Sequence, residues 1–161
     1  MQAHGGPVAG IDEAGRGPWA GPVVAAAVIL DRDNVPAELD DSKKLTQTKR
    51  EMLFAEISAS ATVGIGIGIA EVVRIDRDNI LQATMWAMAQ ACTALSVRPS
   101  AALVDGNRCP EDLPCPAQPL VKGDALSLSV AAASIVAKVT RDRIMAEIAR
   151  AHPVYGWASN Q

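Results

Sequence analysis

Histidine, aromatic residues and long hydrophobic runs are scarce in this chain of 161 residues. Its two histidines, His4 and His152, are too few for a histidine-based catalytic triad to be expected. No basic region followed by an apolar run opens the sequence, and no charge-free apolar stretch reaches roughly 18 residues, so neither a signal peptide nor a membrane span is predicted. Aromatic residues make up only 3% of the chain, which predicts an aliphatic core.

Cysteine and positive charge are also limited. The three cysteines are an odd number, and Cys109 and Cys115 lie six residues apart rather than in a C-x-x-C pair. A zinc site is therefore not expected, whereas a reducing, cytoplasmic setting is expected. Lys and Arg total 15 against 18 Asp and Glu, a net charge of −3. This balance argues against a wholly basic nucleic-acid module but allows a local basic patch.

Hydrophobic residues make up 49% of the chain, enough to fill the core of one domain. Short apolar runs predict strands at 7–11, 22–30, 62–70 and 101–104, the third with alternating Gly and Ile that would let another element approach closely. Helices are predicted from a cap at Thr46 to 59, from 78 or 79 to before Pro99, and over about 125–150. We therefore predict one α/β domain over 1–161, a mixed sheet with antiparallel first strands and later parallel strands, flanked by helices.

Acidic residues stand next to the predicted buried strands. Asp12 and Glu13 follow the first strand, and Asp105 follows the strand at 101–104. Asp124 comes just before the last predicted helix. If the strands are neighbours, these carboxylates meet at one edge of the sheet and repel one another unless a cation joins them. Oxygen ligands alone favour Mg²⁺ or Mn²⁺, although each residue by itself is also typical of a turn or a helix cap.

Glycines and basic residues form a candidate surface for phosphate. Gly15, Arg16 and Gly17 follow the first two acids, where glycine lets backbone N–H groups reach a ligand and arginine can bind a phosphate. A tight turn with a solvated arginine explains the same residues. Ser42 and Lys43 lie in a polar loop before a helix, where they either bind phosphates or belong to a solvated charge run.

Five segments resemble, in order, the motifs of type 2 ribonuclease H, the bacterial ribonuclease HII family. They are GIDEAGRGPWAGPVVAAAVIL at 10–30, DDSKKL at 40–45, RIDRDNILQATMWAM at 74–88, ALVDGN at 102–107 and KGDALSLSVAAASIVAKVTRDRIM at 122–145. The resemblance covers about residues 8–157, and such an ordered set of motifs is highly specific.

The resemblance implies an RNase H-like fold and an endoribonuclease that cuts the RNA strand of RNA–DNA hybrids. It also implies incision 5′ of single ribonucleotides in duplex DNA, with one or two Mg²⁺ or Mn²⁺ ions, leaving 5′-phosphate and 3′-hydroxyl ends. The catalytic, metal-binding residues would be Asp12, Glu13, Asp105 and Asp124. The nucleic-acid contacts would be Gly15, Arg16, Gly17, Ser42 and Lys43.

One departure from the family lies at the C-terminal end. Family members continue into a Gly-Tyr-Gly-Thr-like motif whose tyrosine stacks beside the ribonucleotide, whereas this sequence ends at Gln161 before such a motif. A C-terminal family segment is therefore expected to be missing, and Tyr155, which precedes it, does not take over its role. The alternative function is a truncated hybrid-binding module that cuts poorly. A monomer is expected, with no membrane and no protein partner indicated.

Overall fold

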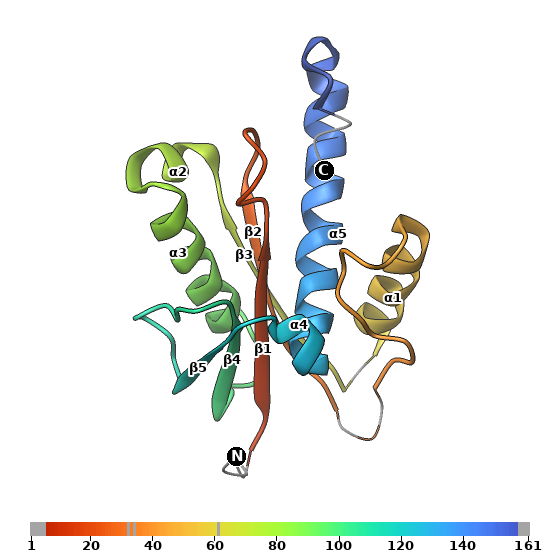
Figure 1. The fold of residues 1–161 in the computed structure, drawn as a ribbon, viewed down its shortest axis with the longest axis vertical. Coiled ribbons are helices and arrows are strands. Elements are labelled where there is room, and N and C mark those ends of the chain that lie inside the picture. Colours follow the sequence, from red (N-terminus) through yellow and green to blue (C-terminus); the bar gives the residue numbers. More distant parts are fainter. Residues whose placement is uncertain (1–5, 32, 34, 61, 158–161) are drawn as a thin grey trace.

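A mixed five-stranded sheet forms the centre of the computed structural model, which describes residues 6–31, 33, 35–60 and 62–157. Its order is β3-β2-β1-β4-β5 (Figure 1). The strands are β1 (Val8–Ala14), β2 (Val23–Ile29), β3 (Gly64–Ala70), β4 (Ala101–Asp105) and β5 (Ala117–Leu120). The first three pair antiparallel, whereas β4 runs parallel to both β1 and β5. The predicted mixed sheet is therefore confirmed.

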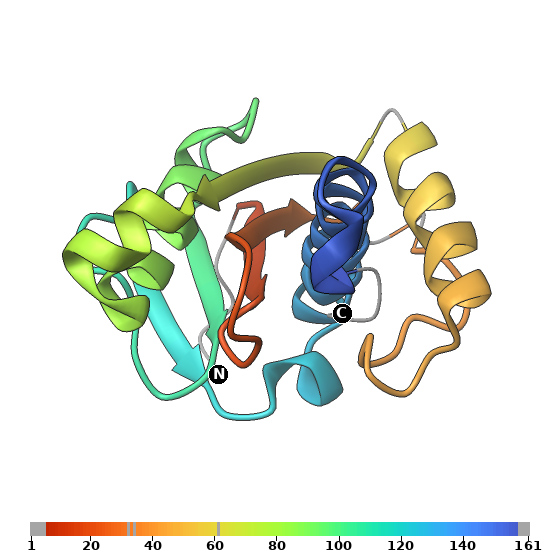
Figure 2. The same ribbon diagram turned by 90° about the horizontal axis from the view of Figure 1, so that it is seen from above.

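Helices cover both faces of this sheet (Figure 2). They are α1 (Gln47–Ala59), α2 (Val72–Asp78), α3 (Ile80–Thr93), α4 (Gly123–Leu126), α5 (Leu128–Ala151) and the short 3-10 helix Pro153–Tyr155. The long helix α5 packs on β1 and β2 from one side, with α1 against it, while α3 packs on β1, β2 and β3 from the other. No helix in the described ranges is long and apolar enough to cross a membrane.

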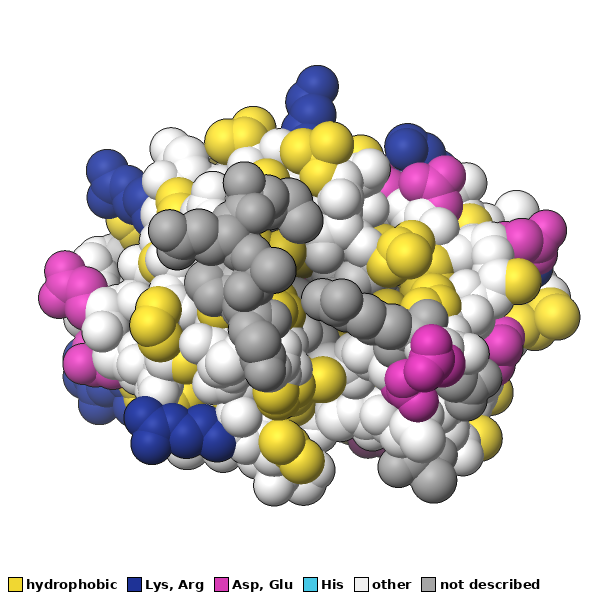
Figure 3. Space-filling view, turned by 90° about the horizontal axis from the view of Figure 1, so that it is seen from below, with side chains coloured by type: hydrophobic (Ala, Val, Ile, Leu, Met, Phe, Trp, Pro, Cys, Tyr) yellow, Lys and Arg dark blue, Asp and Glu magenta, His cyan; other side chains and the backbone are white. Residues whose placement is uncertain are grey.

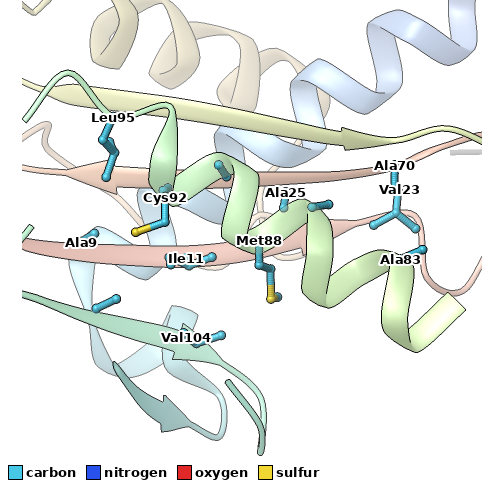
Figure 4. Close-up of a cluster of buried hydrophobic side chains, with 14 residues drawn as sticks. Ala9, Ile11, Val23, Ala25, Ala70, Ala83, Met88, Cys92, Leu95 and Val104 are labelled. Carbon is cyan, nitrogen blue, oxygen red and sulfur yellow. The ribbon is translucent and has the colours of Figure 1, made fainter. Parts of the chain in front are cut away.

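Small residues on the central strands allow close packing on both faces. Successive side chains of β2 point to opposite sides, so Ala25 joins the cluster beneath α3 and Ala26 the cluster beneath α5. Figure 4 shows the first cluster, in which Met88 and Cys92 of α3 lie over Ile11 of β1. The core is aliphatic, as the composition predicts.

Two helices begin at the residues that the sequence marks as caps. The hydroxyl of Thr46 accepts a hydrogen bond from the Lys49 amide at 3.2 Å, and α1 ends at Ala59 as expected. The Asn79 side chain accepts from the amides of Leu81 and Gln82 at 3.0 and 3.1 Å, which fixes the start of α3. These bonds satisfy amides that have no partner inside the helix.

Other expected boundaries were wrong. The first strand does not end at 11 but continues to Ala14, so Asp12 and Glu13 lie within β1. The helix expected over 125–150 is divided at Ser127, whose backbone is extended, into α4 and α5. The segment 107–119, expected as a loop, contains most of the edge strand β5, whose Pro119 hides its strand character. The charged helix α2 was not expected.

The close approach predicted for the Gly–Ile strand is confirmed. A Cβ atom on Gly66 would lie 2.0 Å from the Ala91 carbonyl oxygen, and one on Gly68 would lie 2.1 Å from that of Ala87. The backbone of α3 therefore rests directly on β3. This contact places α3 too close to the sheet for any side chain larger than hydrogen at these two positions.

Candidate functional site

The candidate carboxylates come from three elements that converge beside β1. Because Ile11 of β1 pairs with Val104 of the parallel strand β4, Asp12 and Asp105 follow at matching positions on neighbouring strands. Asp124 lies on α4, which is tied to β4 by a 2.7 Å hydrogen bond from the Gly123 amide to Asp105 Oδ1. The strands are neighbours, as the convergence argument required.

The start of α5 lies against β1, and α4 immediately precedes it. A Cβ atom on Gly10 would lie 2.2 Å from the backbone of Ser129, so only glycine permits this contact. Gly10 is two residues before Asp12 in β1, and Ser129 is five residues after Asp124. The packing of α5 therefore carries Asp124 toward the two strands.

Asp12 is the buried centre of this group, with 7% of its surface exposed. Burial raises its pKa well above the ordinary value, and repulsion from Glu13, then Asp105, and also Asp124 raises it further. Its Oδ1 accepts a 2.7 Å hydrogen bond from the Glu13 amide, and this bond lowers the pKa of Asp12. All three other candidate carboxylates thus lie within electrostatic reach of Asp12.

The donor chemistry of this group fits a hard divalent cation, although the ligands are not gathered around one point. Across the described residues, no three His, Cys, Asp or Glu side chains stand close enough to hold a metal ion as they are placed. Glu13 is instead paired with Arg16 at 3.2 Å, and Asp124 accepts from the Ala125 amide at 2.9 Å. Carboxylate oxygens without histidine or cysteine are the ligands that Mg²⁺ and Mn²⁺ favour, so a bound ion requires these side chains to rotate.

Asp41 is a further carboxylate at the site that reasoning from the sequence missed. Burial raises the pKa of Asp124, and repulsion from Asp41 and then Asp105 adds to the increase. A hydrogen bond between the side chains of Asp41 and Asp124 acts in the same direction. The only signal in the sequence was the acidic pair before Ser42, which is separated from Asp124 by about half of the chain.

The loop that carries Gly15, Arg16 and Gly17 follows β1 directly. Gly15 has a φ of 109°, which favours glycine, and a Cβ there would lie 2.5 Å from the Arg141 side chain. A Cβ on Gly17 would meet nothing within 4 Å, so the backbone is open on that side. Arg16, expected to bind phosphate, is paired with Glu13 in this structure.

Arg141 of α5 holds this loop from beneath. Only 1% of Arg141 is exposed, and its guanidinium donates to the carbonyl oxygens of Pro22 at 3.1 Å and Ala20 at 2.9 Å. The arginine thus satisfies carbonyl groups that the loop buries. No motif around Arg141 in the sequence indicated this internal role.

Replacing Arg141 by leucine is expected to lower the free energy of unfolding by roughly 3 kcal/mol or more, since the buried Pro22 carbonyl and the half-buried Ala20 carbonyl lose their donor. Thermal unfolding followed by circular dichroism measures this loss. Arg143→Leu on the same helix is the matched control, because its ion pair with Glu51 is about half exposed and is worth at most about 1 kcal/mol. Equal destabilisation by the two substitutions would contradict the role of Arg141.

Ser42 and Lys43 lie in a loop that is also fixed from below. The Ser42 amide donates to the Ser134 hydroxyl of α5 at 3.3 Å, and the Ser42 carbonyl accepts from Arg50 at 3.0 Å. Ser42 is buried, whereas Lys43 is exposed beside Asp41. The loop thus exposes both Lys43 and Lys44, and Lys44, paired with Asp40 at 3.0 Å, lies within electrostatic reach of Asp41 and Asp124.

The lower end of the molecule, in the orientation of Figure 1, offers no comparable concentration of charge on its described part. In its described part, basic and acidic side chains are interspersed around the rim, with hydrophobic side chains between them (Figure 3).

A mixed sheet with acidic side chains on two parallel neighbours defines, together with its helices, an RNase H-like fold. A family model described as ribonuclease HII matches residues 9–161. A ribonuclease HII of Magnetococcus marinus is 60% identical over 154 residues, which cover 94% of this chain and 71% of that protein. The ribonuclease H2 crystal structure from Pyrococcus horikoshii OT3 superposes with a TM-score of 0.81 at 29% identity, covering 96% of this chain and 80% of that one. The structure of Bst-RNase HIII in complex with Mn²⁺ has a TM-score of 0.75 at 22% identity over 90% of this chain and 55% of that one, which shows the shared fold.

These findings define the protein as a ribonuclease, a hydrolase of phosphodiester bonds. The chain belongs to the ribonuclease HII family. Membership supports endoribonuclease activity on RNA–DNA hybrids and a general dependence on divalent metal ions.

Proposed function

We propose that the chain incises duplex DNA 5′ of a single embedded ribonucleotide, in addition to cutting RNA in longer hybrids, and leaves 5′-phosphate and 3′-hydroxyl ends. The observation that carries the cleavage part of this proposal is the buried Asp12, whose pKa is raised by burial and further by acidic residues from β1, β4 and α4. Holding these carboxylates together costs free energy unless a cation binds between them during function.

The cation site would consist of Asp12, Glu13, Asp105 and Asp124, taking one or two Mg²⁺ or Mn²⁺ ions. When bound, such ions supply the Lewis acidity that activates water and stabilises the departing 3′-oxygen. The residues themselves have distinct tasks. Asp12 supplies a carboxylate fixed by the Glu13 amide, and Asp105 fixes α4 through the Gly123 amide.

Recognition of the ribonucleotide would fall to the loop after β1. The open backbone at Gly17 and the left-handed backbone at Gly15 let amide and carbonyl groups approach a ribose closely. A 2′-hydroxyl both donates and accepts hydrogen bonds, which distinguishes RNA from DNA. Arg16 would exchange its partner Glu13 for phosphate once Glu13 binds a metal ion. Lys43, with Ser42 beneath it, would hold a backbone phosphate without choosing a sequence.

A duplex with one embedded ribonucleotide tests this function. We expect a single incision 5′ of the ribonucleotide with Mg²⁺ or Mn²⁺, and none after chelation or in Asp124→Asn. An all-DNA duplex of the same sequence is the control and should stay intact.

The results also separate the alternative readings. Binding of the duplex without incision under either metal would favour the hybrid-binding module. Incision of the all-DNA duplex would overturn the recognition of the 2′-hydroxyl.

A further inference from the structure

Trp19 lies on the loop between β1 and β2, and its side chain is fully exposed, at 103% of the reference surface. Tryptophan has the largest apolar surface of any side chain and is usually mostly buried. In this position it contributes nothing to the core. Such an exposed indole is typical of a contact with another molecule.

The loop presents Trp19 from a fixed base. The next residue, Ala20, gives its carbonyl to the buried Arg141 guanidinium at 2.9 Å, and Pro22 gives its carbonyl at 3.1 Å. Gly21, between them, has a φ of 88° and packs on Met145, where a Cβ would lie 2.3 Å from the sulfur. Because the base of the loop is fixed in the free protein, a ligand that contacts Trp19 loses less entropy in ordering it.

The position of Trp19 limits what it can contact. Trp19 is six positions after Glu13, and six residues extend at most about 20 Å. A duplex rises roughly 3.4 Å per base pair, so Trp19 lies within about six base pairs of the carboxylates. This distance allows the indole to contact a duplex whose cleaved phosphate lies at Asp12.

We propose that Trp19 is a substrate-binding residue that packs its indole against sugar and base edges in the minor groove, a few nucleotides from the cut. This inference rests on the proposed function. A loop whose Gly15–Gly17 backbone contacts a ribose 2′-hydroxyl faces the minor groove, which in RNA-containing helices is wide and shallow. Apolar side chains bind there against sugars and base steps without selecting a sequence.

Kinetics on long and short duplexes test the contact. With at least about ten base pairs on both sides of the ribonucleotide, Trp19→Ala should raise KM about tenfold, the range of one lost aromatic contact, with kcat within twofold. Trp19→Phe should recover most of the loss. The duplex is then shortened to about two base pairs on one side of the ribonucleotide and, in a second substrate, on the other side. Shortening the side that Trp19 contacts should abolish the difference in KM between wild type and Trp19→Ala.

Iodide quenching gives a second readout that does not depend on cutting. In the Asp105→Asn background, the long duplex should protect tryptophan fluorescence from iodide, and Trp19→Phe should remove this protection. Trp86→Phe is the matched control and should keep it, because Trp86 lies on α3 beneath Arg74.

The outcomes separate the two proposals. If wild type cuts the ribonucleotide but Trp19→Ala keeps its KM on long duplexes, the contact is overturned and the proposed function stands. If wild type does not cut, the proposed function fails, and unchanged iodide quenching on adding duplex overturns the Trp19 contact as well. Unfolding temperatures of wild type and Trp19→Ala should agree, since the side chain is exposed.

Discussion

Replacing Asp12 by asparagine is expected to stop incision and, without metal, to make the protein more stable. Asp12 is buried among acidic residues, so its ionised form opposes folding. Asparagine has nearly the same shape, can accept the Glu13 amide bond, and can donate to the neighbouring carboxylates. We expect a gain of about 1–3 kcal/mol in the free energy of unfolding at neutral pH, measured in chelator by thermal unfolding. Incision should fall at least about a hundredfold, because a ligand of the cation is lost.

The pH dependence gives this prediction a definite sign. Since the pKa of Asp12 is raised in the folded state, the native protein holds its proton over a pH range in which the unfolded chain has lost it. The contribution of Asp12 to stability should therefore fall as pH rises above about 4, the ordinary aspartate value, until the folded pKa is passed. The asparagine variant lacks this contribution, so its gain in stability over the wild type should grow with pH across this range.

Metal addition reverses the order of stability. A bound ion stabilises the folded protein by an amount that grows with its concentration relative to the dissociation constant. Mg²⁺ or Mn²⁺ should therefore raise the unfolding temperature of the wild type more than that of Asp12→Asn. Asp112→Asn, at an exposed position, is the control and should change neither stability nor incision. A metal-free Asp12→Asn protein that is less stable than wild type would contradict the electrostatic argument.

The carboxylate group could be anticipated because its members follow a local rule. Asp12 and Asp105 each stand at or near the end of a short apolar strand, which is visible in the sequence. Their adjacency depends on the parallel pairing of β1 with β4, which the α/β pattern favours but does not specify. Assignment of the metal-binding role therefore came from the family resemblance and remains a prediction.

The supporting residues could not be anticipated in the same way. Arg141 binds the carbonyl of Pro22 across 119 positions of the chain, and the Ser42 amide binds Ser134 across 92. Nothing local distinguishes Arg141 from the exposed Arg143 two residues later. Asp41 likewise meets Asp124 only through the packing of the 40–45 loop beside α4 and α5. Such contacts depend on tertiary structure alone.

The helices and strands also divide into those that the local sequence predicts and those that depend on tertiary structure. Strand β3 and the capped helices α1 and α3 carry local patterns that predicted their existence and their starts to within two residues, although α3 ends at Thr93, about five residues before the end expected at Pro99. Strand β5 is a four-residue edge strand that contains a proline, and α2 is a short helix with four charged residues among seven. Both lack a periodic hydrophobic face, so their identification requires the neighbouring elements.

Replacing Gly68 by alanine is expected to cause a large loss of stability, because α3 rests directly on the backbone of β3 at this position. The new Cβ would lie 2.1 Å from the Ala87 carbonyl oxygen and 2.8 Å from the Ala91 amide nitrogen. Both are backbone atoms of α3, so the helix itself must move away from the sheet. We expect a loss of about 3 kcal/mol or more, at the upper end of the cost of overpacking. At roughly 2–4 °C per kcal/mol, the unfolding temperature should fall by about 6–12 °C, as calorimetry can measure.

Gly64→Ala is the matched control, since Gly64 lies on the same strand and the same face. Its Cβ would lie 3.5 Å from Ile29 and 3.7 Å from Leu95, which are ordinary contacts with side chains. We expect a change within about 0.5 kcal/mol. Equal effects of the two substitutions would show that glycine matters in β3 through backbone entropy rather than through the approach of α3. A much larger effect at Gly68 would show that the spacing between sheet and helix is set by the missing side chain.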